Sequence, residues 1–123
     1  IVFDEAGHLV LVRHSYAPGL YLPGGGVKRG ESPEGAVRRE LAEEIGARDC
    51  DLAPFATYHS VGEGKRDTIH LFVARGARLS PRDNAEITTI IACDPDDLPD
   101  DLTPATFRRL AEVRGEAPPS ATW

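Results

Sequence analysis

The chain has 123 residues, of which 41% are hydrophobic and 28% are charged, and its formal net charge is −6. This length and composition indicate one globular domain with a single core. The acidic balance argues against a nucleic-acid polymer as partner, because a phosphate backbone would be repelled. It does not argue against a small phosphorylated ligand, because a bound cation changes the local sign of the charge.

The cysteine and hydropathy patterns favour a cytoplasmic protein. Cys50 and Cys93 have neither the spacing of a zinc site nor that of a disulfide framework. No apolar run approaches the roughly 20 residues needed to cross a membrane. Because the chain opens within a strand-like pattern and without Met, we expect an upstream segment to precede Ile1.

The first half of the chain is expected to form strands and one helix. Residues 1–3 and 8–13 are predicted strands joined by a turn, and residues 16–21 a loop, since they include Pro18-Gly19. The Leu-Pro-Gly-Gly-Gly run at 22–26 suits neither helix nor strand. Ser32 as cap and Pro33 as first residue predict a helix that ends at Gly46.

The second half is expected to contain a hairpin, a further strand and a second helix. Residues 52–61 and 67–75 form the predicted hairpin, 76–85 a loop and 86–93 a strand. The helix from Pro104 to Gly115 is expected to turn Phe107, Leu110, Ala111 and Val113 inward. The tail, residues 116–123, is expected to be loosely held. Residues 1–123 are thus predicted to be one α+β domain, an α/β/α sandwich with a mixed sheet between helices.

The helix at 33–45 carries an unfavourable concentration of negative charge. Glu40, Glu43 and Glu44 fall within an arc of roughly 100° beside the apolar stripe of the helix. The Glu40–Glu44 pair repels at i,i+4, and the helix dipole disfavours anions in the last turn. A divalent cation would reverse the sign of these terms, because Mg²⁺ prefers carboxylate oxygens. The alternative is a solvated acidic face.

Two neighbouring features favour the metal-site interpretation. Arg39 is the nearby cation and can pair with Glu43 at i,i+4 or reach back to Glu31. The glycine run lets the backbone approach a ligand closely, and Glu31 adds a carboxylate just before the helix. A glycine loop, a single acid and an acidic helix in sequence are compatible with a phosphate-and-metal site, and before any resemblance is considered a solvated acidic face explains them equally well.

These residues resemble the signature of the Nudix hydrolase superfamily. That signature is Gly, five residues, Glu, seven residues, Arg-Glu, a hydrophobic residue, any residue, Glu-Glu, any residue, Gly and a hydrophobic residue. It is matched in register by Gly25, Glu31, Arg39, Glu40, Leu41, Glu43, Glu44 and Gly46. Only the last position departs from the pattern, since Ala47 stands where a larger aliphatic residue is usual. The order of predicted strands and helices also fits the Nudix fold along nearly the whole chain.

The resemblance implies a role for each of these residues. Glu40, Glu43 and Glu44 would hold Mg²⁺ or Mn²⁺, and Glu40 is also a candidate for the base that deprotonates the attacking water. Arg39 would orient Glu40, so the expected catalytic residues are Arg39 and these three glutamates. Glu31 would brace the junction between loop and helix.

Further binding residues are expected outside the acidic helix. Glu86 is a candidate for an additional metal ligand, although a solvated glutamate at the start of a strand explains it equally well. Arg13, at the end of a strand, is a candidate for a phosphate contact, against the alternative of a surface cation. Gly24 and Gly25 are expected to approach the substrate through their backbone.

The implied substrate is a nucleoside diphosphate derivative, either ADP-ribose or a nucleotide sugar, or a nucleoside triphosphate. Residues 88–92 lack the bulky aromatic residues that many relatives carry there, so the sequence does not indicate how a base is recognised. A Nudix-like sensor domain that binds a nucleotide without cutting it is one alternative, and an acidic helix that docks a protein is another. Dimers are common in the superfamily, so the resemblance also admits a homodimer.

Overall fold

A computed structural model describes residues 1–62, 65–80 and 87–123 of this chain. It contains six strands and two helices in the order β1, β2, β3, α1, β4, β5, β6, α2. The strands are β1 (Val2–Asp4), β2 (Leu9–His14), β3 (Ala17–Tyr21), β4 (Asp51–Gly62), β5 (Lys65–Ala77) and β6 (Ile87–Cys93). The helices are α1 (Pro33–Ile45) and α2 (Pro104–Val113).

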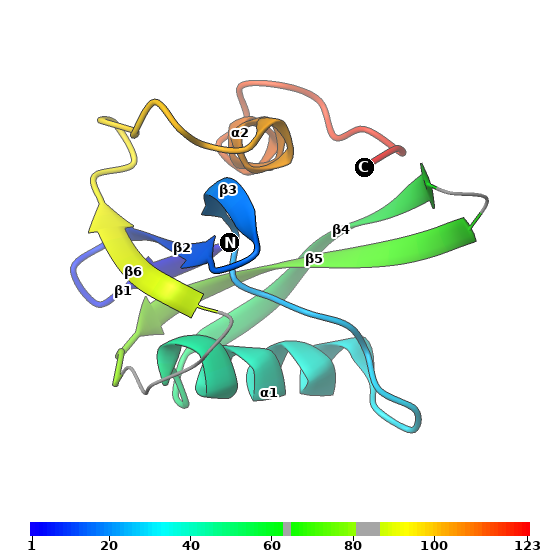
Figure 1. The fold of residues 1–123 in the computed structure, drawn as a ribbon, viewed down its shortest axis with the longest axis horizontal. Coiled ribbons are helices and arrows are strands. Elements are labelled where there is room, and N and C mark those ends of the chain that lie inside the picture. Colours follow the sequence, from blue (N-terminus) through cyan, green and yellow to red (C-terminus); the bar gives the residue numbers. More distant parts are fainter. Residues whose placement is uncertain (63–64, 81–86) are drawn as a thin grey trace.

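The strands form one mixed sheet with the path β3-β2-β1-β5-β4, and β6 pairs with β2. Strand β1 is parallel to β5, and the other pairs are antiparallel. Val10 pairs with both Val2 and Ala92, which places β1 and β6 on opposite edges of β2. The β4–β5 hairpin extends well beyond β1, as the two long green strands of Figure 1 show.

One helix covers each face of the sheet (Figure 1). On the face of α1, Leu41 and Ile45 pack on alternate residues of β2, Val10 and Val12. On the other face, Leu110 of α2 packs with a cluster that includes Leu9, Leu11, Leu20, Tyr58 and Leu71. The predicted α/β/α sandwich is confirmed. Cys50 and Cys93 are free thiols. No helix within the described ranges is long and apolar enough to cross a membrane.

The segment predicted as a loop at 16–21 is instead largely strand β3. Val12 pairs with Tyr21, and His14 pairs with Ala17. Pro18 and Gly19 are tolerated because β3 ends the path of the sheet, where a missing N–H removes no ladder hydrogen bond.

The inward face predicted for α2 is wrong at Phe107, whose relative exposure is 60%. The helix instead buries Arg109 and Glu112, which are 1% and 6% exposed. The Arg109 guanidinium lies over the ring of Tyr58 at 4.4 Å, and its Nε lies 3.2 Å from a Glu112 oxygen in an ion pair without hydrogen-bond geometry. The Tyr58 hydroxyl donates to Glu112 at 2.5 Å. Burial and this carboxylate both raise the pKa of Tyr58.

The tail at 116–123 is docked against the core, contrary to the prediction. Its backbone pairs with β4 through His59, which donates to Ala121 and accepts from Trp123. Arg109 donates to the carbonyls of Thr122 and Trp123, at 3.2 Å and 3.0 Å. The tail therefore contributes backbone acceptors to a buried arginine that the rest of the fold leaves incompletely bonded.

Removing one partner of the buried Arg109–Glu112 pair is expected to destabilise the domain strongly. Glu112→Gln leaves the guanidinium charge buried, so we expect the free energy of unfolding to fall by about 3–5 kcal/mol. Glu116→Gln is the matched control, because Glu116 is exposed and pairs with Arg114 at the surface, where such pairs contribute about 1 kcal/mol or less. Urea unfolding followed by circular dichroism measures both, and equal losses in the two variants would contradict the argument.

Candidate active site

The ends of α1 are fixed by local contacts, and this sets the positions of its carboxylates. The Ser32 hydroxyl accepts from the Gly35 N–H at 3.0 Å, and Pro33 occupies the first turn. Gly46 ends the helix with φ of 66°, and a Cβ there would lie 1.7 Å from the carbonyl oxygen of Ser80. The end of the helix therefore requires glycine at position 46, both for its backbone conformation and for the close packing against Ser80.

Arg39 joins the glycine loop, the residue before the helix and the helix itself. Its Nε and one Nη donate to the two oxygens of Glu31 at 2.8 Å and 3.0 Å. The same Nη donates to the Gly26 carbonyl at 2.9 Å. The other Nη donates to Glu40 at 2.7 Å and to Glu43 at 3.3 Å. Five hydrogen bonds match the five N–H donors of a guanidinium, so its orientation is fixed.

Glu44 holds the loop from a second point. Its side chain is buried, and one oxygen accepts from the Gly24 N–H at 2.8 Å. Because Arg39 holds the Gly26 carbonyl, the loop is attached to α1 on both sides of Gly25.

Gly25 lies so close to Glu40 that a side chain at this position would require the Glu40 carboxylate to move. A Cβ on Gly25 would lie 2.5 Å from the carboxyl carbon of Glu40 and 2.5 Å and 2.8 Å from its oxygens. At Gly26 the same atom would meet nothing within 4 Å. The loop therefore presses its backbone against Glu40 at a single residue.

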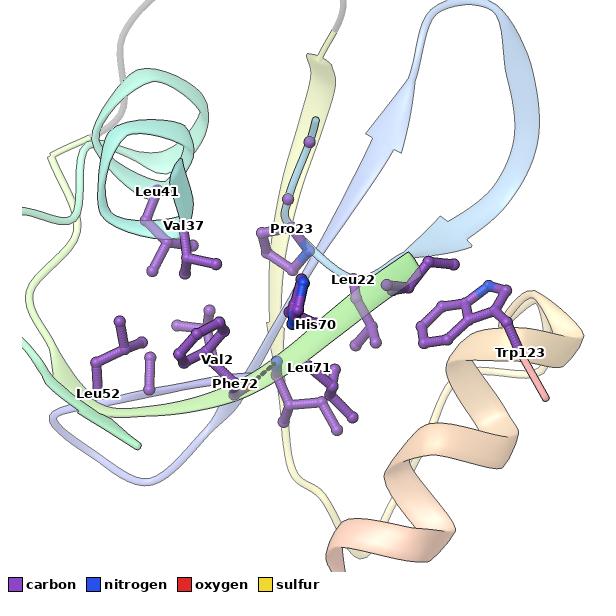
Figure 2. Close-up of a pocket in the computed structure, with 15 residues that line it drawn as sticks. Val2, Leu22, Pro23, Val37, Leu41, Leu52, His70, Leu71, Phe72 and Trp123 are labelled. Atoms are coloured by element: carbon purple, nitrogen blue, oxygen red, sulfur yellow. Dashed lines mark hydrogen bonds between the residues drawn. The ribbon is translucent and has the colours of Figure 1, made fainter. Parts of the chain in front are cut away.

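An apolar cavity of about 220 Å³ borders the loop on another side. In Figure 2, Val37 and Leu41 of α1 line one side of it, Val2, Leu52 and Phe72 of the sheet line another, and Leu22, Pro23, His70 and Trp123 lie across from the helix. Gly24 and Gly25 contribute backbone to its wall. Because this part of the loop faces a cavity, its position depends on the hydrogen bonds to Arg39 and Glu44.

Charge is unevenly distributed across the site. Hydrogen bonds from Arg39 and from the Lys28 N–H lower the pKa of Glu31 to about 2. The hydrogen bonds that Arg39 donates to Glu31 and Glu40 raise the pKa of Arg39. The Glu31–Arg39 pair is thus fully ionised at neutral pH. Of the three further glutamates, Glu40 and Glu43 accept hydrogen bonds from the same guanidinium, and Glu44 accepts one from the Gly24 amide.

The helix glutamates fit a divalent cation in donor type. Glu40 and Glu43 each engage Arg39 through one oxygen only, and carboxylate oxygens are the ligands that Mg²⁺ prefers. No group of three His, Cys, Asp or Glu side chains in the described part of the chain is drawn together around one point. To bind one metal ion together, Glu40, Glu43 and Glu44 would therefore have to change their side-chain conformations. Glu43 is the most exposed of the three, at 53%.

The structure brings together most of the residues predicted for the site. Arg39, Glu40, Glu43, Glu44, Gly24 and Gly25 lie in one contact network, to which Glu31 belongs. Both partners proposed for Arg39, Glu31 and Glu43, are used at once. The Gly26 carbonyl was not foreseen as a partner, because nothing in a glycine run distinguishes one carbonyl from another.

Two predicted residues are not part of this network. Arg13 forms an ion pair with Asp101 at 2.6 Å, and alternation places it on the face of Leu9 and Leu11, which pack beneath α2. Its role in phosphate binding remains a prediction. Glu86 lies outside the described residues.

Comparison with known proteins assigns the chain to a family. A family model described as the NUDIX domain matches residues 1–113. The chain belongs to the NUDIX family. This confirms the resemblance expected from the residues between Gly25 and Gly46.

Individual relatives and solved structures agree with this assignment. A putative mutator protein MutT4 of Mycobacterium tuberculosis is 38% identical over 101 residues, covering 77% of this chain and 40% of that protein. A putative 8-oxo-dGTP diphosphatase of Bacillus subtilis is 30% identical over 120 residues, covering 95% and 78%. The crystal structure of a MutT NUDIX hydrolase from Burkholderia pseudomallei superposes with a TM-score of 0.76 and 27% identity, covering 90% and 92%. The match thus spans less than half of the mycobacterial relative.

The close approach at Gly25 predicts that the two adjacent glycines respond differently to alanine. Gly25→Ala is expected to displace the Glu40 carboxylate and to weaken Mn²⁺ binding by about 10- to 100-fold, the usual effect of disturbing the support of a metal ligand. Gly26→Ala, which meets open space, is the matched control. Isothermal titration with Mn²⁺ measures both, and equal affinities in the two variants would show that the contact with Glu40 does not matter.

The lowered pKa of Glu31 predicts a specific acid sensitivity. Folding depresses this pKa from 4.5 to about 2, so the ionised carboxylate stabilises the folded state above pH 4.5, and the contribution disappears as the pH falls to about 2. The difference in unfolding free energy between the parent and Glu31→Gln should be constant above pH 5 and shrink across that range. Glu34→Gln, at an exposed pair with Arg38, should show a small difference throughout. Denaturant unfolding at each pH provides the measurement, and a difference that does not change with pH would refute the pairing.

Proposed function

We propose that this domain hydrolyses the diphosphate linkage of a nucleoside diphosphate derivative, with Mg²⁺ or Mn²⁺ held by Glu40, Glu43 and Glu44. The observation that carries the proposal is the Arg39 network, which holds two of these carboxylates beside a backbone loop. The third, Glu44, is buried with a hydrogen bond to the same loop. A cation bound to these carboxylates would neutralise their charge and could in turn bind a negatively charged ligand beside the glycine backbone.

The substrate class that we favour is a nucleoside triphosphate, with 8-oxo-dGTP the first to test. Support comes from the Bacillus subtilis relative, named a putative 8-oxo-dGTP diphosphatase, which aligns with nearly the whole chain. ADP-ribose and nucleotide sugars belong in the same screen, because the acidic helix acts on the diphosphate that they share.

The metal, when bound, supplies charge stabilisation at phosphorus and a water of lowered pKa. Glu40 has one oxygen fixed by Arg39 at 2.7 Å, which leaves the other to accept a proton from the attacking water. The water oxygen forms a bond to phosphorus, the anhydride P–O bond breaks, and two phosphorylated fragments leave. Arg39 holds the Glu40 carboxylate in place during this step, and the absence of a side chain at Gly25 leaves the space that the carboxylate occupies.

Retention of all three helix glutamates favours hydrolysis over a sensor domain that only binds a nucleotide. A sensor has no need of a carboxylate cluster whose mutual repulsion destabilises its helix.

Glu44→Gln is expected to lower turnover by on the order of 100-fold or more, because a bound metal contributes several kcal/mol to transition-state stabilisation. The glutamine oxygen still accepts from the Gly24 N–H, so the fold should be retained. Turnover is measured as product release from 8-oxo-dGTP, dGTP, ADP-ribose and a nucleotide sugar, with Mg²⁺ and with EDTA.

Glu34→Gln is the control for this measurement, since Glu34 is an exposed residue of α1 paired with Arg38. Unchanged Mg²⁺-dependent turnover in Glu44→Gln would remove the proposed role of this carboxylate. Absence of turnover on every compound, with nucleotide binding intact, would favour the sensor.

A further inference from the structure

The chain enters the glycine loop between two fixed points. On one side, the Leu20 carbonyl accepts from the Thr103 N–H at 3.1 Å, at the start of α2. On the other side, the Gly24 N–H donates to Glu44 of α1 at 2.8 Å. Leu22 lies midway between these points, so the direction in which the chain enters the loop depends on what the Leu22 side chain packs against.

Leu22 lies between two cavities. One is the apolar cavity of about 220 Å³ beside the glycine loop, and the other, of about 520 Å³, lies between the end of β3, the first turn of α2 and the tail. Among the described residues, Leu22 and Trp123 line both cavities, and both side chains pack on the core cluster of the α2 face. Figure 2 shows the indole extending from the tail towards Leu22. The two side chains thus form a partition between the cavities.

Trp123 is the rigid half of this partition. Its ring meets Tyr58 edge-on at 5.3 Å, and the Arg109 guanidinium lies over it at 4.9 Å. Both of these neighbours are buried, and the backbone N–H of Trp123 donates to His59 at 3.0 Å. Because a close-packed core transmits displacement, a side chain fixed in this way also limits the movement of the residue beside it.

We propose that Trp123 is a positioning residue that holds the glycine loop through Leu22. With a cavity on each side of Leu22, the indole is the fixed surface that sets where the chain turns towards Gly24. The consequence for metal binding rests on the proposed function, since the next residue, Gly25, packs against the Glu40 carboxylate. The tail would then support the active site as well as the core beneath α2.

Hydrogen exchange of the Gly24 amide reports on the loop without metal or substrate. Trp123→Ala joins the two cavities and frees Leu22. The bond from Gly24 to Glu44 should then open more often, and the amide should exchange faster by roughly 10-fold or more. Val113→Ala is the matched control, because Val113 packs on the same cluster but lines neither cavity. NMR of the metal-free protein gives both rates, and an unchanged rate in Trp123→Ala, or an equal rise in Val113→Ala, would overturn the inference.

Manganese affinity measures the consequence at the proposed site. We expect Trp123→Ala to bind Mn²⁺ roughly 10-fold more weakly, the lower end of the usual effect of disturbing the support of a metal ligand. Trp123→Phe, which keeps a planar ring in the same place, should recover most of the affinity, whereas Val113→Ala should bind as the parent does. Isothermal titration provides the comparison. A loss of affinity that follows the loss of stability in both alanine variants would reduce Trp123 to an ordinary core residue.

The two proposals fail separately. Faster exchange at Gly24 in Trp123→Ala, with no Mn²⁺ binding by the parent chain, would retain the support of the loop and remove the metal site. Mn²⁺ binding by the parent, with unchanged exchange in the variant, would retain the site and remove Trp123 from its support. If Trp123→Ala does not fold, Leu22→Ala removes the other half of the partition and should also speed exchange at Gly24. The parent rate in that variant would contradict the inference.

Discussion

The site depends on a single guanidinium shared among carboxylates that would otherwise repel one another. Arg39 donates to Glu31, Glu40, Glu43 and the Gly26 carbonyl, so one side chain links the loop, the approach to α1 and the helix. Without it, Glu40, Glu43 and Glu44 would lie together at the unfavourable end of a helix dipole. The arrangement remains one positive charge against several negative ones, so the neighbourhood stays negative and suited to a cation.

The glycine loop depends on the same network because packing does not hold it from every side. A cavity lies against Gly24 and Gly25, whereas Gly25 touches the Glu40 carboxylate. Hydrogen bonds to Glu44 and from Arg39 thus determine where the loop stands. Any change in the position of these carboxylates would be transmitted to the loop backbone, so binding of a cation at the proposed site would also change the shape of the loop.

The sequence predicted the features that depend on neighbouring residues. The caps Ser32 and Gly46, the glutamates of α1 and the two predicted partners of Arg39 all lie between Glu31 and Gly46, and short-range geometry determines their contacts. The Pro18-Gly19 pair misled the prediction, because whether proline breaks a strand depends on whether that strand is at an edge.

The prediction failed also where a residue's partner is distant in the sequence. Periodicity assigned Phe107 to the core and did not include Arg109 among the inward residues. Arg109 is buried because it meets Tyr58, 51 positions earlier, and the tail carbonyls. The tail was expected to be loose for the same reason, since its binding depends on a buried charge that the pattern of hydrophobic residues does not reveal.

The domain therefore contains two arginine-centred clusters of similar chemistry and different burial. The side chain of Arg39 is 20% exposed and one of its partners, Glu43, is 53% exposed, so water and ions can replace these contacts at low cost. The side chain of Arg109 is 1% exposed, and that of Glu112 is 4% exposed, so separating them would leave an unpaired charge in the core. Burial thus makes the cluster beneath the tail a permanent part of the fold. Partial exposure leaves the cluster on α1 able to exchange an internal partner for a ligand, which is the property that a metal and phosphate site requires.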